Sequence, residues 1–184
     1  MVDKILFEKE FEYKIISADL SADGILSVVT SAQRYASQLH VFDENYEEEI
    51  FTWSASDEYI VSASADEKTK TVAAAALSAN EAGEMVTTVH IFTTEAAVEL
   101  AKKEFRGASV LSLEYDADGD VKLICDTVAA TISITNVMQF DATPLGTAVM
   151  GARVASARGR LFDRIADCCF SAAEANEDFF DEEK

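Results

Sequence analysis

One stretch decides the fold: Lys14-Ile15-Ile16-Ser17-Ala18-Asp19, which returns as Tyr59-Ile60-Val61-Ser62-Ala63-Ser64 and again as Ser109-Val110-Leu111-Ser112-Leu113-Glu114. A second motif keeps a similar spacing, since His40-Val41-Phe42-Asp43 returns as His90-Ile91-Phe92-Thr93. Such short runs of β-branched, apolar and small polar residues are typical of strands. The sequence therefore predicts one strand-rich unit that is written three times.

The spacing of these copies indicates an architecture. A strand-rich unit of roughly 45–50 residues has the length of a β-propeller blade. We expect an all-β-dominated chain with about three four-stranded antiparallel blades in residues 1–136, as units of about residues 4–46, 47–95 and 96–136. An ordinary β-sandwich or barrel with a helix packed outside is the alternative fold.

Four local signals shape these units. Asp23-Gly24 predicts a tight hairpin, because Gly accepts a positive φ without a Cβ clash. Val72 to Ala76 favours helix by propensity, but small residues also suit a strand crowded between neighbouring sheets, and the repeat predicts a strand there. The stretch from Thr94 to Arg106 is balanced between the two, and repeat position predicts a strand. Glu49 to Trp53 is expected to open the second unit.

The composition changes beyond Asn136. Apolar residues at helical spacing predict an amphipathic helix over residues 155–173, followed by an acidic tail to residue 184. Known propellers close with four or more blades, so three blades leave apolar faces uncovered. Residues 137–184 are therefore expected to be a helical cap and tail. Pairing with a second copy, or a sequence that is a piece of a longer protein, would also account for the missing blades.

The first unit carries a family resemblance. Tyr13-Lys14-Ile15-Ile16-Ser17-Ala18-Asp19-Leu20-Ser21-Ala22-Asp23-Gly24, followed by Leu39-His40-Val41-Phe42-Asp43, resembles a blade of an uncharacterised bacterial β-propeller family, distantly similar to WD-repeat and quinoprotein-like propellers. The resemblance covers about residues 4–136. It implies a propeller displayed outside the cell on an N-terminal membrane anchor, which this sequence lacks, and it implies no activity.

Composition narrows the possible partners. The formal net charge of −19 on 184 residues repels nucleic acid and anionic lipid, and it favours a basic partner or a divalent cation where it has a function. No apolar run approaches the roughly 20 residues of a membrane-spanning helix. We expect no nucleic-acid partner and no membrane insertion by this chain. Its location is expected to be cytoplasmic, or extracytoplasmic where an anchor has been removed.

One loop has the composition of a cation site. Asp116, Asp118 and Asp120 alternate as the first ligands of a calcium loop do. The glycine stands at the fourth loop position instead of the sixth, and Thr127 stands where a bidentate Glu is expected. The related Ala22-Asp23-Gly24 favours a plain turn. Calcium is therefore the candidate cofactor, with these three aspartates as its ligands, and no other cofactor is expected.

Catalytic motifs are missing from the sequence. No nucleophile elbow, phosphate-binding loop or paired zinc ligands occur, and the repeat-related His40 and His90 are expected to lie partly exposed on strands. Phe11, Trp53 and Phe105 are expected to be core packing residues. We therefore expect a non-enzymatic protein-binding or scaffold module whose partner is another protein or a second copy. The alternative is a propeller-type hydrolase or lyase with an acidic or calcium-dependent site.

Overall fold

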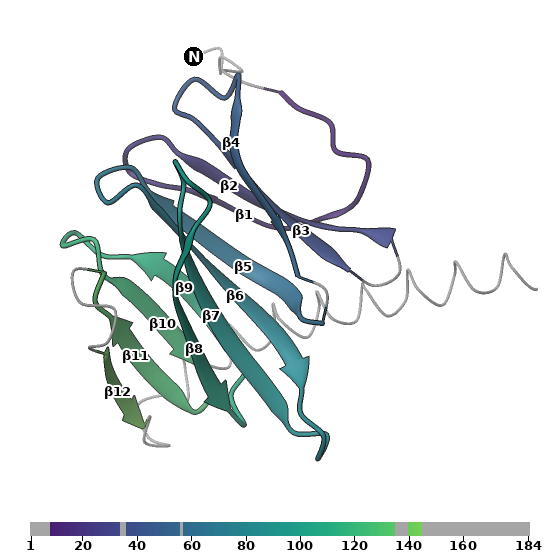
Figure 1. Ribbon diagram of the computed structural model, residues 1–184, viewed down its shortest axis with the longest axis vertical. Helices are drawn as coiled ribbons and strands as arrows, with labels where there is room; N and C mark the ends of the chain where they lie inside the picture. Colours follow the sequence, from purple (N-terminus) through teal and green to yellow (C-terminus); the bar gives the residue numbers. More distant parts are fainter. Residues whose placement is uncertain (1–7, 34–35, 56, 135–139, 145–184) are drawn as a thin grey trace, which may run out of the picture. The chain divides into compact units, whose positions relative to one another are not determined.

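The described residues form twelve β-strands in three antiparallel sheets (Figure 1). The computed structural model describes residues 8–33, 36–55, 57–134 and 140–144. The first sheet contains β1 (Ile15–Leu20), β2 (Leu26–Ser31), β3 (Ser37–Phe42) and β4 (Glu49–Ser54). The second contains β5 (Tyr59–Asp66), β6 (Thr71–Ala79), β7 (Met85–Thr93) and β8 (Glu99–Arg106). The third contains β9 (Val110–Tyr115), β10 (Val121–Cys125), β11 (Val128–Ile132) and β12 (Phe140–Pro144).

Each sheet is a meander whose strands pair in chain order. Tight turns make this possible, and both Asp-Gly hairpins are present, with φ of +90° at Gly24 and +83° at Gly119. Within the described residues the first strand of a sheet does not pair with its fourth, so no sheet closes into a barrel. The all-β prediction is confirmed, and the barrel alternative does not describe these sheets.

The second sheet is buried on both of its faces. One core cluster packs Val29, Leu39 and Val41 of the first sheet against the second sheet. The other packs the opposite face of the second sheet against the third, through residues such as Val121 and Leu123. The sheets therefore form three packed layers, with the second sheet in the middle.

Strand β6 explains how the middle layer is accommodated. Ala74 and Ala76 belong to the cluster shared with the first sheet, whereas Ala73 and Ala75 belong to the cluster shared with the third. All four are fully buried. Successive side chains of a strand point to opposite faces, so an alanine run lets two sheets approach one strand closely. The predicted strand at Val72 to Ala76 is confirmed for the reason expected.

Irregularities recur at corresponding places in the sheets. The strand pairing shifts register between Ile15 and Ser17 in β1, between Ile60 and Ser62 in β5, and next to Val110 in β9. A second shift displaces Ile50 of β4 and Leu100 of β8 from direct pairing. A bulge bends its strand and re-aims the side chain beside it, and both Ile50 and Leu100 are exposed.

Two expectations about strand placement need revision. Glu49 to Trp53 pairs with β3 and forms the outer strand of the first sheet, so it does not open the next one. Within Thr94 to Arg106, only Glu99–Arg106 is a strand, and the residues before it form the turn after β7. The sheets are therefore offset by one strand from the sequence units. The predicted C-terminal helix and acidic tail lie outside the described residues.

Candidate functional site

Loops of the first two sheets surround a hollow of about 370 Å³, which we name the acidic hollow. Its charged lining consists of four carboxylates and one ammonium group, from Asp43, Glu44, Glu67, Glu95 and Lys70. The apolar lining is Ile25 and Ile50. Three connections supply the charged residues: the loop after β3, the turn after β5 and the turn after β7. Negative charge from two sheets therefore converges on one concave surface.

Backbone hydrogen bonds fix the loops that form the acidic hollow. The amide of Thr94 donates to the carbonyl oxygen of Lys70 at 2.9 Å, which joins the turns after β5 and β7. The amide of Tyr46 donates to the carbonyl oxygen of Asp43 at 3.0 Å and closes the loop after β3. Lys70 also forms an ion pair with Glu67. The carboxylates are thus carried on loops whose backbone is held in place.

Asp43 has an incompletely satisfied carboxylate. Its Oδ2 atom accepts a long hydrogen bond of 3.5 Å from Asn45, whereas its Oδ1 atom is buried and has no hydrogen-bond partner among the described residues. Leaving a buried acceptor unsatisfied is unfavourable, and native structures contain few such atoms.

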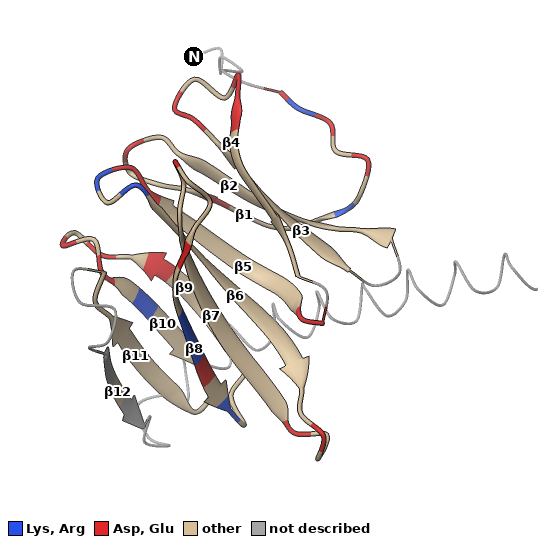
Figure 2. Cartoon of the chain, viewed as in Figure 1, with Lys and Arg blue, Asp and Glu red and all other residues tan. Residues whose placement is uncertain are grey.

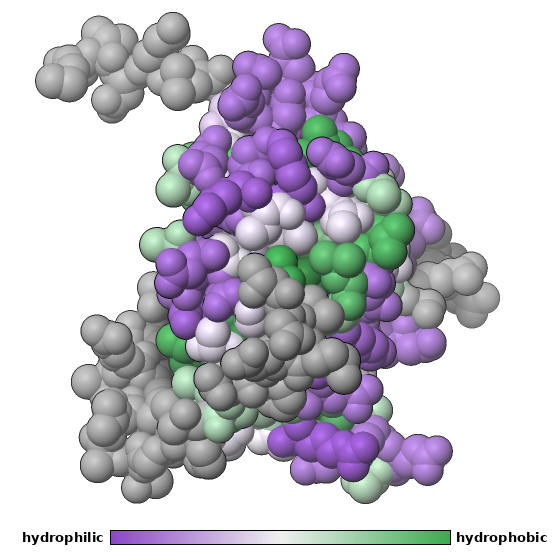
Figure 3. Space-filling model, turned by 60° about the vertical axis from the view of Figure 1, so that its left-hand side comes forward, coloured by the Kyte–Doolittle hydropathy of each residue, from purple (hydrophilic) through white to green (hydrophobic). Residues whose placement is uncertain are grey.

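The charge pattern of the described chain agrees with this site. Acidic residues concentrate in loops and at strand ends, while most of the strand length is uncharged (Figure 2). Apolar atoms also reach the surface, where Figure 3 shows hydrophobic residues next to hydrophilic ones. Ile50, on the wall of the acidic hollow, is 36% exposed. The acidic hollow therefore combines negative charge with apolar surface.

A second polar cluster surrounds His90 of β7. Its Nδ1 lies 2.6 Å from Oε1 of Glu99, and its Nε2 lies 2.6 Å from Oε2 of Glu58. Lys102 donates to the other oxygen of Glu58 at 3.1 Å. Trp53 packs on the imidazole with ring centroids 4.7 Å apart. The cluster thus joins β7 and β8 to the connection that precedes β5.

These contacts give Glu58 a structural role. Burial raises the pKa of Glu58, but the hydrogen bonds with His90 and Lys102 together lower it by more. The net pKa of Glu58 therefore lies below its usual range. Glu58 therefore stays ionised and acts as an acceptor. The expectation of a partly exposed strand histidine is wrong for His90, which is 5% exposed, because a carboxylate beside each ring nitrogen allows the imidazole to be buried. His40 is half-buried, with Nδ1 2.5 Å from Oε1 of Glu49.

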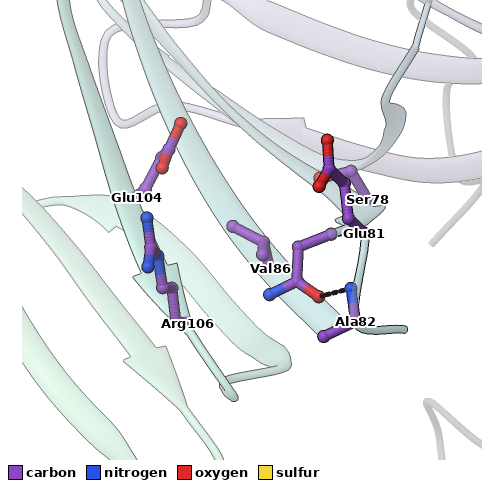
Figure 4. Close-up of a pocket in the computed structure, with 7 residues that line it drawn as sticks. Ser78, Glu81, Ala82, Val86, Glu104 and Arg106 are labelled. Carbon is purple, nitrogen blue, oxygen red and sulfur yellow. Dashed lines mark hydrogen bonds between the residues drawn. The ribbon is translucent and has the colours of Figure 1, made fainter. Parts of the chain in front are cut away.

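A third surface is an open groove of about 430 Å³ over the far ends of β6, β7 and β8 (Figure 4). Glu104 and Arg106 of β8 line one wall, and Ser78 and Glu81 line the other (Figure 4). The hydrogen bond from the Ala82 amide to Oδ1 of Asn80, 3.0 Å long, shapes the hairpin on that side. Its lining has mixed charge, so the groove selects less clearly for one sign of ligand than the acidic hollow.

The predicted calcium loop forms the turn between β9 and β10. Asp116 Oδ1 accepts hydrogen bonds from the amides of Asp118 and Asp120, each 3.0 Å long, and Asp116 Oδ2 pairs with Lys122 at 3.0 Å. The bond from Lys122, together with these backbone bonds, holds the pKa of Asp116 below its usual value. Asp120 Oδ1 accepts from the amide of Ile134 at 3.1 Å. The carboxylates of Asp116 and Asp120 therefore contribute to turn structure.

Metal binding at that loop stays a prediction. Across the described part of the chain, no group of three or more His, Cys, Asp or Glu residues is arranged to hold a metal ion. Cys125 is a buried thiol, and its burial, with the nearby Asp126 carboxylate, raises its pKa to about 12. Such a thiol is protonated at neutral pH and is a poor nucleophile or ligand. Cys168 and Cys169 lie outside the described residues.

Two of the three aromatic residues predicted to pack in the core lie in the clusters between sheets, and the third does not. Trp53 and Phe105 pack in the clusters between sheets, which confirms their assignment to the core. Phe11 lies outside both clusters. It contacts the other face of the first sheet, with its ring centroid 5.4 Å from that of His40 and 6.2 Å from that of Phe42.

The acidic hollow was missed by sequence reasoning. Asp43-Glu44-Asn45 and the region of Glu67 are recognised from the sequence only as polar turns. The order of the strands did contain a signal. The turns at Asp43, Glu67 and Glu95 follow β3, β5 and β7, so each lies at the same end of its meander. Sequence alone did not indicate that turns from neighbouring sheets would face a common space.

Among the described residues, no helix is long and apolar enough to cross a membrane. No protein-family model matches the chain, and no curated protein matches it.

Proposed function

We propose that the protein is a non-enzymatic protein-binding or scaffold module of β-propeller type, and that its acidic hollow takes a basic segment of a partner protein. Propeller-type stacking is supported by three consecutive four-stranded meanders packed face to face. It is also supported by the bulges near the start of β1, β5 and β9. Blades of a propeller share such a plan because each packs on its neighbours in the same way.

One observation carries the binding proposal: four carboxylates from three loops converge on the acidic hollow. Among the described residues, the one ammonium group in its lining, that of Lys70, is already paired with Glu67. Lysine and arginine side chains supply positive charge and N–H donors for these carboxylates, while their aliphatic stems can contact Ile50.

The proposal is tested with labelled basic and acidic peptides of equal length in fluorescence anisotropy. The double variant Glu44→Gln/Glu95→Gln should weaken binding of the basic peptide by roughly tenfold, since a close charge pair at a partly buried interface contributes about 1–2 kcal/mol. Raising the salt concentration should weaken wild-type binding as well. Equal binding by the wild type and the double variant would contradict the proposal.

The control is a change of equal charge in another place. Glu81→Gln/Glu104→Gln removes two carboxylates from the open groove of Figure 4 and leaves the acidic hollow unchanged. This variant should bind the basic peptide as the wild type does. A loss equal to that of the first pair would mean that net charge, and not the acidic hollow, attracts the peptide.

The alternative function makes a different prediction for the same residues. A hydrolase or lyase with an acidic or calcium-dependent site would need its carboxylates for a cation or for proton transfer. Calcium would then raise the unfolding temperature, and Glu44→Gln/Glu95→Gln would abolish that rise. The binding module predicts no loss of calcium response in that variant.

A further inference from the structure

The segment Glu8–Tyr13 covers the face of the first sheet that is turned away from the second. Phe11 contacts His40 and Phe42, as given above, and the Lys9 ammonium lies 4.1 Å from the centroid of the Phe42 ring. Lys9 also lies 5.9 Å from the Phe11 ring centroid. Just after the segment, the amide of Ser31 donates to the carbonyl oxygen of Lys14 at 2.8 Å.

The same arrangement exists between the first and second sheets. There Trp53 of β4 contacts His90 at 4.7 Å and Phe92 at 4.9 Å between ring centroids. His90 and Phe92 of β7 correspond to His40 and Phe42 of β3, and each histidine pairs with a glutamate nine residues later. Phe11 therefore lies on the first sheet where Trp53, on the outer strand of a neighbouring sheet, lies on the second.

The covered face is built to receive a side chain. Phe42 is fully buried, and Val28 and Thr30 of β2 are 3% and 2% exposed. Val28 pairs directly with His40, which places both on this face. An aromatic ring bound here buries a large apolar area, and a cation over Phe42 adds attraction to its ring face.

We propose that the face formed by Val28, Thr30, His40 and Phe42 is a peptide-docking site. Residues 8–13 of the same chain occupy it in the structure. The partner is a segment of another protein that carries a cation two residues before an aromatic residue and binds in their place. The occupant seen in the structure defines this chemistry through Lys9 and Phe11. The segment thereby acts as a built-in competitor, which lowers the apparent affinity for the partner. The inference concerns a second surface and does not depend on the acidic hollow.

A second copy of the chain is the less favoured occupant. Continued stacking would bring this face against the outward face of the third sheet, where Glu114, Lys122 and Thr131 pair across the strands. Lys122 donates to Thr131 at 2.9 Å and pairs with Asp116, so the charged group on this surface already has partners, and Ile124 is the exposed apolar side chain beside it. The formal net charge of −19 also opposes self-association.

The test uses a labelled peptide with the sequence of residues 8–14, and the same peptide with Ala in place of Phe. Phe11→Ala removes the aromatic side chain that occupies the site and should bind the first peptide at least about tenfold more tightly than the wild type, which is blocked. Phe11→Trp copies the contact of Trp53 and should stay blocked like the wild type. Because this peptide carries more acidic than basic residues, Glu44→Gln/Glu95→Gln should leave its binding unchanged.

Several results would overturn the proposal. These are a Phe11→Ala variant with native Trp53 fluorescence that binds neither peptide, and one that binds both peptides equally. Mass doubling from 20.0 kDa without peptide binding would assign the face to a second copy instead. If Phe11→Ala loses the native Trp53 fluorescence, the test uses Lys9→Ala in place of that variant. A Lys9→Ala protein that binds the first peptide no more tightly than the wild type then overturns the proposal.

Discussion

Replacing Ala74 by leucine tests the three-layer arrangement most directly. Ala74 is fully buried in the cluster between the first and second sheets, and its pairing partner Ala63 is 3% exposed. Leucine adds three carbon atoms where two sheets meet, and overpacking of this kind destabilises a protein by about 1–3 kcal/mol. At about 2–4 °C per kcal/mol for a chain of this length, the unfolding temperature should fall by roughly 2–12 °C.

The assay is thermal and urea unfolding followed by circular dichroism, with two companion variants. Ala73→Leu places the same carbons against the third sheet and should have a similar effect, because Ala73 is also fully buried. Ala79→Leu lies on the exposed end of the same strand and should stay within about 0.5 kcal/mol of the wild type. An Ala74→Leu variant no less stable than Ala79→Leu would refute close packing between the first two sheets.

Three further outcomes are expected. Because the pKa of Glu58 is lowered, the stability that its carboxylate contributes is present above the ordinary glutamate pKa of about 4.3 and is lost as the pH falls toward the folded pKa. The urea midpoint of Glu58→Gln should therefore vary less with pH in this range than that of the wild type. Equal variation would contradict the role of His90. Gly119→Ala should be more destabilising than Gly24→Ala in urea unfolding. Both glycines have a positive φ, which disfavours alanine by about 1–2 kcal/mol. In addition, a Cβ at Gly119 would lie 2.8 Å from a side-chain carbon of Thr69, whereas the nearest atom to a Cβ at Gly24 is 3.7 Å away. Peptide mapping after maleimide treatment at pH 7 should find Cys125 unmodified in the folded protein and modified in urea, because burial raises its pKa to about 12; modification in the folded protein would contradict its burial.

Local sequence signals predicted much of the fold. The alanine run of β6 has helical propensity, yet repeat position and small side-chain size together identified a strand packed on both faces. The Asp-Gly pairs marked both hairpins, because few residues other than glycine adopt their backbone conformation. These features depend on short-range chemistry, which a single sequence records directly.

Sheet membership could not be predicted in the same way. Glu49 to Trp53 lies between two candidate sheets, and its strand-like composition fits the edge of either. Its assignment to β4 depends on pairing with β3. The acidic hollow escaped prediction for a related reason: Glu44 and Glu95 are far apart in the chain, and each looks like an ordinary turn residue until the packing of two sheets brings their loops together.

The two-sided burial of the second sheet also has consequences for cooperativity. Each core cluster joins two consecutive sheets, and every sheet is made of strands that are neighbours in the chain. Loss of either flanking layer would therefore expose one complete face of the middle layer while leaving the other interface intact. Each layer should therefore be stabilised by the layers next to it in the chain. The alanine-rich strand β6, which is buried on both faces, should be the last part to exchange its amide hydrogens with solvent.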